Sequence, residues 1–265
     1  MSNSSKYRRL SCLIVLLFLA TGGMAAGQMA QEHQHEMAGM EDADGMEAAR
    51  GRMIYEMSCI HCHGARGRGD GAASIFIGPY SHPRPNAFTH GIFKFRSTES
   101  GELPMLSDLM RTIREGIPGI MPSFRNLGKE QIRQVALYIS REFIKRELPT
   151  QTSIQYVEHV GPYTYSVDSV HRGEQLYRQL KCDGCHGKDG KGIGTPMRDE
   201  RGLEIHAMDL TRSEMFGNGS SHEDIYRTIM TGLDGTPMPG YSDLFQKKEE
   251  SAWDLVHYIL SLQGR

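Results

Sequence analysis

The feature that most constrains this chain is a short arrangement of two cysteines and a histidine that occurs twice. It reads Cys59-Ile-His-Cys62-His63 in the first half and Cys182-Asp-Gly-Cys185-His186 in the second. The fifth cysteine of the 265-residue chain, Cys12, lies in an apolar stretch near the start. A period of roughly 120 residues is too long for a solenoid and predicts two tandem domains.

Each copy has the form C-x-x-C-H, the attachment signature of c-type haem. Two thiols at this spacing on one helical turn can form thioethers to both vinyl groups of one porphyrin, and the adjacent histidine then lies under the iron. A C-x-x-C pair is otherwise half of a zinc site or a redox dithiol, and neither of these, nor a disulfide framework, requires a histidine after both pairs. The sequence therefore predicts two covalently bound haem c groups. The expected attachment residues are Cys59, Cys62, His63, Cys182, Cys185 and His186.

The segments that precede the two motifs also match. Residues 51–55 (GRMIY) stand before the first motif and residues 173–177 (GEQLY) before the second, and both segments are expected to be helical. Glycine lowers helix propensity, so its place in both helices predicts a close crossing by another helix. On the first helix, Ala49, Met53 and Met57 fall on one apolar face.

Each copy continues with two more predicted helices. Residues 108–116 (DLMRTIREG) match residues 224–232 (DIYRTIMTG), and each segment ends at a glycine that favours a helix stop. Ser107 or Asp108 in the first copy, and Ser221 in the second, are the expected N-caps.

The last helix of each copy is amphipathic. Tyr138 and Tyr258 occupy matching places on these helices and are expected at the crossing with Gly51 and Gly173. No series of segments alternates as strands would, so the predicted fold is all-α, with two small helical bundles each wrapped round a haem. The apolar positions at helical spacing are Ile132, Val135, Ala136, Ile139, Phe143, Ala252, Leu255, Val256 and Ile259.

A haem iron held by one histidine needs a second axial ligand unless it binds substrate. The loop after each penultimate helix carries a methionine followed by proline, at Met121 and Met238. The proline stiffens the loop, and Gly119 and Gly235 allow it to approach a porphyrin edge. We therefore predict Met121 and Met238 as the second ligands. The competing methionines, which lack a repeated place beside proline, are Met105, Met110, Met197, Met208, Met215 and Met230.

The chain resembles tandem (dihaem) class I c-type cytochrome domains. The features that carry this resemblance are the two C-x-x-C-H motifs, the Gly…Tyr helices, the Met-Pro loops and the terminal helices. The resemblance covers residues 45–147 and 167–263. It implies a role as an electron carrier, with His63/Met121 and His186/Met238 as the two ligand pairs. The first copy departs from a minimal cytochrome by an insert, residues 78–103, that contains the basic-aromatic run Phe93-Lys94-Phe95-Arg96. This insert resembles domains of dihaem cytochrome subunits of respiratory oxidoreductases.

The expected function is transfer of single electrons between redox protein partners of a respiratory chain. The protein would act as a periplasmic carrier or as the cytochrome subunit of a membrane-associated oxidoreductase complex, and not as an enzyme by itself. The alternative is a dihaem peroxidase-type enzyme with one openable haem, against which the two equivalent Met-Pro loops count. Arg111 and Arg227, in register before these loops, would pair with haem propionates or lie exposed on a helix face.

Before the first domain, residues 1–25 read as an export signal, with a basic start, an apolar run and small residues at the end. An uncleaved segment that associates with the inner membrane is the alternative. Residues 26–46 are polar, and their composition predicts a disordered tail. The residues of this tail that would suit copper are His33, His35, Met37 and Met40.

The expected boundaries follow from these patterns. Cytochrome c domain 1 spans residues 47–148, a linker spans 149–166, and cytochrome c domain 2 spans 167–265. The formal net charge of −2 provides no basic field to hold nucleic acid, so the expected partners are redox proteins.

Overall fold

The computed structural model describes residues 44–75, 84–152, 164–192, 194–245 and 248–263. The chain divides into a unit Met1–Glu47 and a unit Ala48–Arg265, and the second unit holds both haem motifs. The predicted export signal, the copper candidates of the tail and most of the predicted linker lie outside the described residues. Among the described residues, no helix combines the length and the apolar character needed to cross a membrane.

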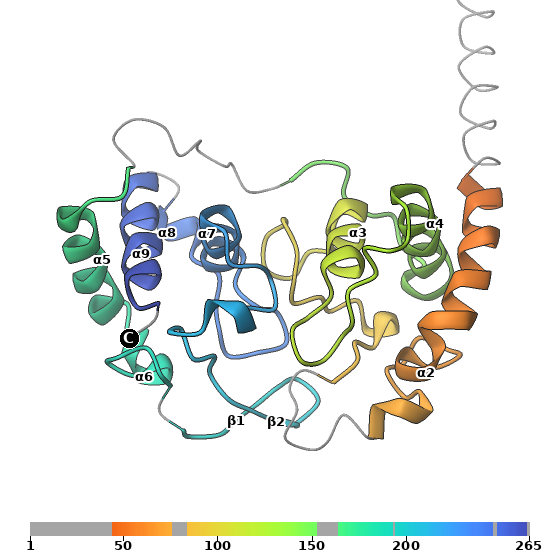
Figure 1. The fold of residues 1–265 in the computed structure, drawn as a ribbon, viewed down its shortest axis with the longest axis horizontal. Coiled ribbons are helices and arrows are strands. Elements are labelled where there is room, and N and C mark those ends of the chain that lie inside the picture. Colours follow the sequence, from red (N-terminus) through yellow and green to blue (C-terminus); the bar gives the residue numbers. More distant parts are fainter. Residues whose placement is uncertain (1–43, 76–83, 153–163, 193, 246–247, 264–265) are drawn as a thin grey trace, which may run out of the picture. The chain divides into compact units, whose positions relative to one another are not determined.

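The first copy consists of short helices joined by loops (Figure 1). Residues 48–58 are helical and lead into the first motif. The elements that follow are α2 (Ile60–His63), η1 (Ala72–Ile75), η2 (Phe88–His90), α3 (Leu106–Glu115), α4 (Lys129–Ile139) and the π-helical turn η3 (Ser140–Ile144).

The second copy has its main helices in the same order and adds a small ribbon and a short extra helix. Strands β1 (Met197–Arg198) and β2 (Glu204–Ile205) pair antiparallel, with Met197 opposite Ile205. This is the one sheet in the described part of the chain, and the predicted all-α fold is confirmed. The helices are α5 (Val167–Gln179), α6 (Asp183–His186), η5 (Ser213–Met215), α7 (His222–Thr231), α8 (Ser242–Phe245) and α9 (Glu249–Ser261).

The predicted glycine crossings are present in both copies. A Cβ added to Gly173 of α5 would overlap the carbonyl oxygen of Asp254 in α9 and would lie 2.8 Å from the Cβ of Tyr258. A Cβ added to Gly51 would overlap the carbonyl of Gln134 in α4. Only glycine permits these backbones to approach so closely.

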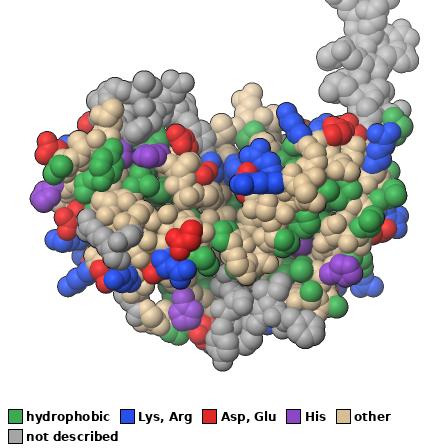
Figure 2. All heavy atoms as spheres, in the orientation of Figure 1, with side chains coloured by type: hydrophobic (Ala, Val, Ile, Leu, Met, Phe, Trp, Pro, Cys, Tyr) green, Lys and Arg blue, Asp and Glu red, His purple; other side chains and the backbone are tan. Residues whose placement is uncertain are grey.

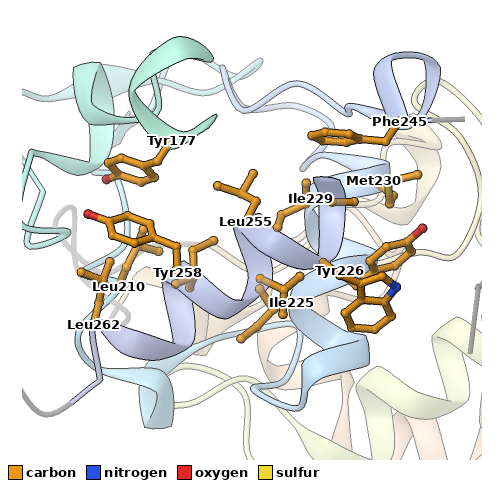
Figure 3. Close-up of a cluster of buried hydrophobic side chains, with 14 residues drawn as sticks. Tyr177, Leu210, Ile225, Tyr226, Ile229, Met230, Phe245, Leu255, Tyr258 and Leu262 are labelled. Carbon is orange, nitrogen blue, oxygen red and sulfur yellow. The ribbon is translucent and has the colours of Figure 1, made fainter. Parts of the chain in front are cut away.

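The tyrosine rings complete each crossing. Tyr177 and Tyr258 have ring centroids 5.1 Å apart and are tilted by 57°, and Figure 3 shows the two rings next to each other in the second core. In the first core, the rings of Tyr55 and Tyr138 lie at 5.3 Å. Centroid separations of this size are favourable for aromatic pairs, so the tyrosines fix the crossing as well as fill it.

Helices α7 and α9 supply most of the remaining side chains of the second core. The Trp253 ring stacks on Tyr226 with a centroid separation of 4.5 Å. The predicted N-cap of α7 is confirmed, because the Ser221 side chain accepts a hydrogen bond from the N–H of Asp224. Other apolar side chains of this core include Leu210, Ile225, Ile229, Phe245, Leu255, Val256 and Leu262.

Two local predictions for the first copy were wrong. Helix α3 begins earlier than expected, with Met105 at the N-cap and Asp108 at the third helical position, where its carboxylate accepts the N–H of Met105. The predicted apolar face of the first helix is exposed, with Met53 at 65% and Met57 at 76% of their full accessibility. The face carrying Ala48, Gly51 and Tyr55 is buried instead, because the close crossing and the tyrosine determine which side meets the core.

Candidate haem sites

The second motif opens onto a cavity of about 590 Å³. Its wall includes all four residues predicted for this site, the two cysteines Cys182 and Cys185, His186 and Met238. Most of the remaining wall is apolar, as in the sites that bind cofactors of this kind, and the volume lies in the ordinary range for such sites. The donor set and the cavity therefore suit a haem c.

His186 is oriented by a backbone group. Its Nδ1 lies 3.0 Å from the carbonyl oxygen of Met208. A carbonyl oxygen only accepts, so Nδ1 carries the proton and Nε2 keeps the lone pair that an iron requires. Burial lowers the pKa of His186 from its ordinary value, partly offset by this hydrogen bond, and the ring remains neutral as a ligand must be.

His63 of the first motif is held in the same way. Its Nδ1 lies 3.2 Å from the carbonyl oxygen of Asn86, and burial again lowers its pKa. The ring also stacks on Phe88 with centroids 4.6 Å apart. The acceptors Asn86 and Met208 stand 23 and 22 residues after their histidines, so the arrangement repeats although the acceptor residue types differ.

A buried tyrosine closes the turn after each motif. The hydroxyl of Tyr55 donates to the carbonyl of Gly64, and the hydroxyl of Tyr177 donates to the carbonyl of Gly187, both at 2.7 Å. Each glycine directly follows the histidine of its motif. The tyrosines therefore tie the end of the short helix that carries the attachment residues to the core.

The cysteine environments argue against the alternatives to haem. Burial raises the pKa of the Cys59 and Cys182 thiols to about 11, whereas a redox-active dithiol depends on a readily formed thiolate. Among the described residues, no group of three or more His, Cys, Asp or Glu side chains converges as a metal ion would need. The zinc and dithiol alternatives therefore gain no support.

The two methionine loops share a backbone hydrogen bond and a glycine turn, although Met238 stands one residue further along its loop than Met121. The N–H of Ile117 donates to the carbonyl of Met121 at 2.8 Å, and the N–H of Leu233 donates to the carbonyl of Met238 at 3.1 Å. Each loop turns at a glycine in the left-handed region, with φ of 73° at Gly119 and 78° at Gly235. These glycines are needed for the turn, which brings the methionine back toward the end of the preceding helix.

The competing methionines differ in their positions. Met197, Met208 and Met215 also line the second cavity, so lining alone does not select the ligand, and the prediction of Met238 rests on the repeated loop. Met230 is buried in the core. In the first copy, Cys59, Met110 and Met121 all pack against the same buried cluster.

The two arginines in register are held by matching ion pairs. Arg111 lies 2.9 Å from the carboxylate of Asp108, and Arg227 lies 2.6 Å from that of Asp224. Each pair joins residues three apart on one helix. Arg227 is buried and Arg111 half-buried, which counts against the expectation of exposed helix-face arginines.

Sequence reasoning missed that the second cavity has a wall from the first domain. The lining of this cavity includes Lys94 and Phe95 of the insert and residues 117–120 of the first methionine loop. Phe95 also lies against Gly217, where an added Cβ would sit 2.8 Å from its ring. The only signal in the sequence was the basic-aromatic run of the insert, and nothing in that run indicates which surface it contacts.

Two helical domains, each with a C-x-x-C-H motif, an oriented histidine and a methionine loop, define an electron-transfer protein of the c-type cytochrome class. Residues 46–139 and 168–259 each match the family model described as cytochrome c oxidase, cbb3-type, subunit III. The chain belongs to this family, as a tandem of two such domains.

A solved structure is similar over most of the chain. It belongs to the reducing HAO-like protein complex of Kuenenia stuttgartiensis, and the matched chain is 33% identical with a TM-score of 0.70. The match covers 81% of this chain and 96% of that one. The search of curated proteins found no match.

Proposed function

We propose that this chain is a dihaem carrier that passes single electrons between redox proteins of a respiratory chain. Cys59 and Cys62 would attach the first haem, and Cys182 and Cys185 the second. When bound, haem c supplies a one-electron iron couple. The proposed axial ligands are His63 with Met121 and His186 with Met238.

The observation that carries this proposal is the second cavity, whose wall holds the two cysteines and the two axial-ligand candidates predicted from the sequence. The protein would supply the setting that a carrier needs. His186 is kept neutral by burial and is oriented by the carbonyl of Met208, and the apolar wall disfavours added positive charge. The stiff loop of Met238 offers a thioether, which favours a positive potential.

We further propose that residues 1–25 direct export to the periplasm, where the protein acts as a free carrier or as a subunit of a membrane-associated oxidoreductase complex. The domain boundaries proposed for the mature protein are 47–148 and 167–265, with the linker between them. A relative found in a protein complex supports the subunit form. On the face shown in Figure 2, acidic and basic side chains are interspersed, which suits protein partners better than nucleic acid.

The haem content and the ligands can be tested on the full-length holoprotein. A pyridine haemochrome assay is expected to give two c-type haems per chain. Met121→Ala and Met238→Ala are each expected to remove about half of the Met-to-iron charge-transfer band of the ferric protein, because each removes one of two equivalent thioethers. Met53→Ala, at an exposed methionine, is the matched control and should leave the band intact.

The same protein separates the carrier from the peroxidase alternative. A carrier with both irons closed by methionine should show no steady turnover of hydrogen peroxide when reduced. A haem content other than two per chain, or a full band in both ligand variants, would refute the assignment. Sustained peroxide turnover would favour the enzyme.

A further inference from the structure

The insert of the first domain contributes a fully buried arginine to the contact with the second domain. The side chain of Arg96 has 0% exposure. Its guanidinium donates to two carbonyls of its own domain, those of Phe93 and Glu99, both at 3.0 Å. It also donates to the carbonyl of Thr231 and to the carboxylate of Asp234 in the second domain, both at 2.8 Å.

Asp234 is held almost entirely by the first domain. Besides Arg96, it accepts the hydroxyl of Ser100 at 2.7 Å and the N–H of Gly101 at 2.8 Å. The side chain is only 15% exposed. A charge-assisted cluster of this kind is stronger than neutral hydrogen bonds, and removing one partner leaves the other charge poorly solvated.

This cluster acts on the loop that carries Met238. Asp234 follows Leu233, whose N–H bonds the carbonyl of Met238, and precedes Gly235, the left-handed turn of the loop. The loop also closes on itself through Thr236, which donates its N–H to Leu233 and accepts the N–H of Met238. A constraint on Asp234 is therefore passed to Met238 through a short, hydrogen-bonded turn.

The first methionine loop has no equivalent. Pro118 occupies the place of Asp234, between the matching residues Ile117 and Gly119. Proline has no carboxylate to receive an arginine. The ion pair between an arginine of one domain and the methionine loop of the other is therefore specific to the second site.

We propose that Arg96 is a positioning residue for the second haem site, which keeps the Met238 loop closed through Asp234. The inference rests on the proposed ligation by Met238. It makes the first domain a determinant of how firmly the second iron holds its methionine, so the ligand strength at the two sites differs although each has a methionine loop.

The test compares ligand replacement at each site separately. Holoprotein carrying Met121→Ala retains only the second site's Met-to-iron charge-transfer band, and Met238→Ala retains only the first site's. Imidazole is then titrated against the remaining band in each background. With Arg96→Gln added, half-displacement at the second site is expected at about tenfold lower imidazole, since a lost charge-assisted bond is worth about one order of magnitude. Displacement at the first site should not change.

Two further variants keep the test decisive. Asp234→Asn retains the size of the side chain and removes its charge, so it is expected to act like Arg96→Gln and serves in its place if that variant does not fold. Arg114→Gln, which removes an exposed arginine paired with Glu115, should change neither site. Equal imidazole affinity with and without Arg96, or an equal change at both sites, would overturn the inference. Absence of the band in the Met121→Ala protein would instead refute ligation by Met238.

Discussion

Replacing Gly173 by alanine tests the structural basis of the whole second domain. The added methyl group would overlap the carbonyl oxygen of Asp254 and would lie 2.7 Å from its carbon and 2.8 Å from the Cβ of Tyr258. The two Asp254 atoms belong to the backbone of α9, so relief requires α5 and α9 to move apart. The separation would also move the ring of Tyr177 away from that of Tyr258, because the two rings lie next to each other at this crossing.

The magnitude follows from two opposing effects. Overpacking a buried contact costs about 1–3 kcal/mol, and a backbone overlap places Gly173→Ala at the upper end of that range. Alanine in place of a mid-helix glycine adds about 1 kcal/mol to the free energy of unfolding, because its helix propensity is higher. The net expectation is a loss of about 2 kcal/mol, which for a domain of this size corresponds to a fall in Tm of roughly 8–16 °C.

The assay is thermal and denaturant unfolding of the full-length holoprotein, followed by far-ultraviolet circular dichroism. Gln175→Ala is the matched control, because this side chain is exposed on the same helix α5 and lies outside the haem motif. Substitutions at exposed, uncrowded positions change the free energy of unfolding by about 0.5 kcal/mol at most, so the control should stay within that range. A Gly173→Ala protein as stable as the wild type would refute the argument that the close crossing requires glycine.

Two further predictions concern hydrogen bonds near the motifs. Tyr177→Phe removes the hydroxyl that donates to the Gly187 carbonyl and leaves that acceptor buried, so chemical denaturation should show a loss of about 1–2 kcal/mol. The second concerns pH: the hydroxyl and the N–H of Thr211 hold the pKa of Asp209 below its usual range. Because the pKa of this carboxyl is lower in the folded than in the unfolded state, the ionised group stabilises the fold at pH values above its unfolded pKa. This contribution is lost as the pH falls through the folded pKa. Asp209→Asn should therefore be less stable than the wild type at neutral pH, and the gap should close below about pH 4; a gap that persists in acid would contradict the assignment.

Much of the fold followed from local patterns. The helical class, the tandem repeat and the crossings at Gly51 and Gly173 were predicted because each depends on residues close together in the chain or on a glycine that has no other use in a helix. The errors were also local. Ala49, Met53 and Met57 form an apolar stripe, yet the helix presents its Tyr55 side to the core, since a contact in three dimensions outweighs a pattern of hydrophobicity.

The site divides in the same way. The attachment residues could be predicted because thioether attachment requires a fixed spacing over a few residues, as at Cys182 to His186, and the methionine loops could be predicted because they repeat beside proline. The carbonyls of Asn86 and Met208, which orient the histidines, could not be recognised, because any residue type supplies a backbone carbonyl. Their position depends on how the loop after each motif folds back.

By itself, the sequence determined the c-type cytochrome class of this chain, through two C-x-x-C-H motifs and two Met-Pro loops repeated in one order. The tertiary structure alone decided how the two halves influence each other. Arg96 and Asp234 stand 138 residues apart and carry no repeated motif, yet they meet at 2.8 Å with the arginine fully buried. Burying such a pair costs desolvation free energy, which is offset by hydrogen-bond partners that the rest of the fold brings together, and these partners cannot be read from the residues next to it.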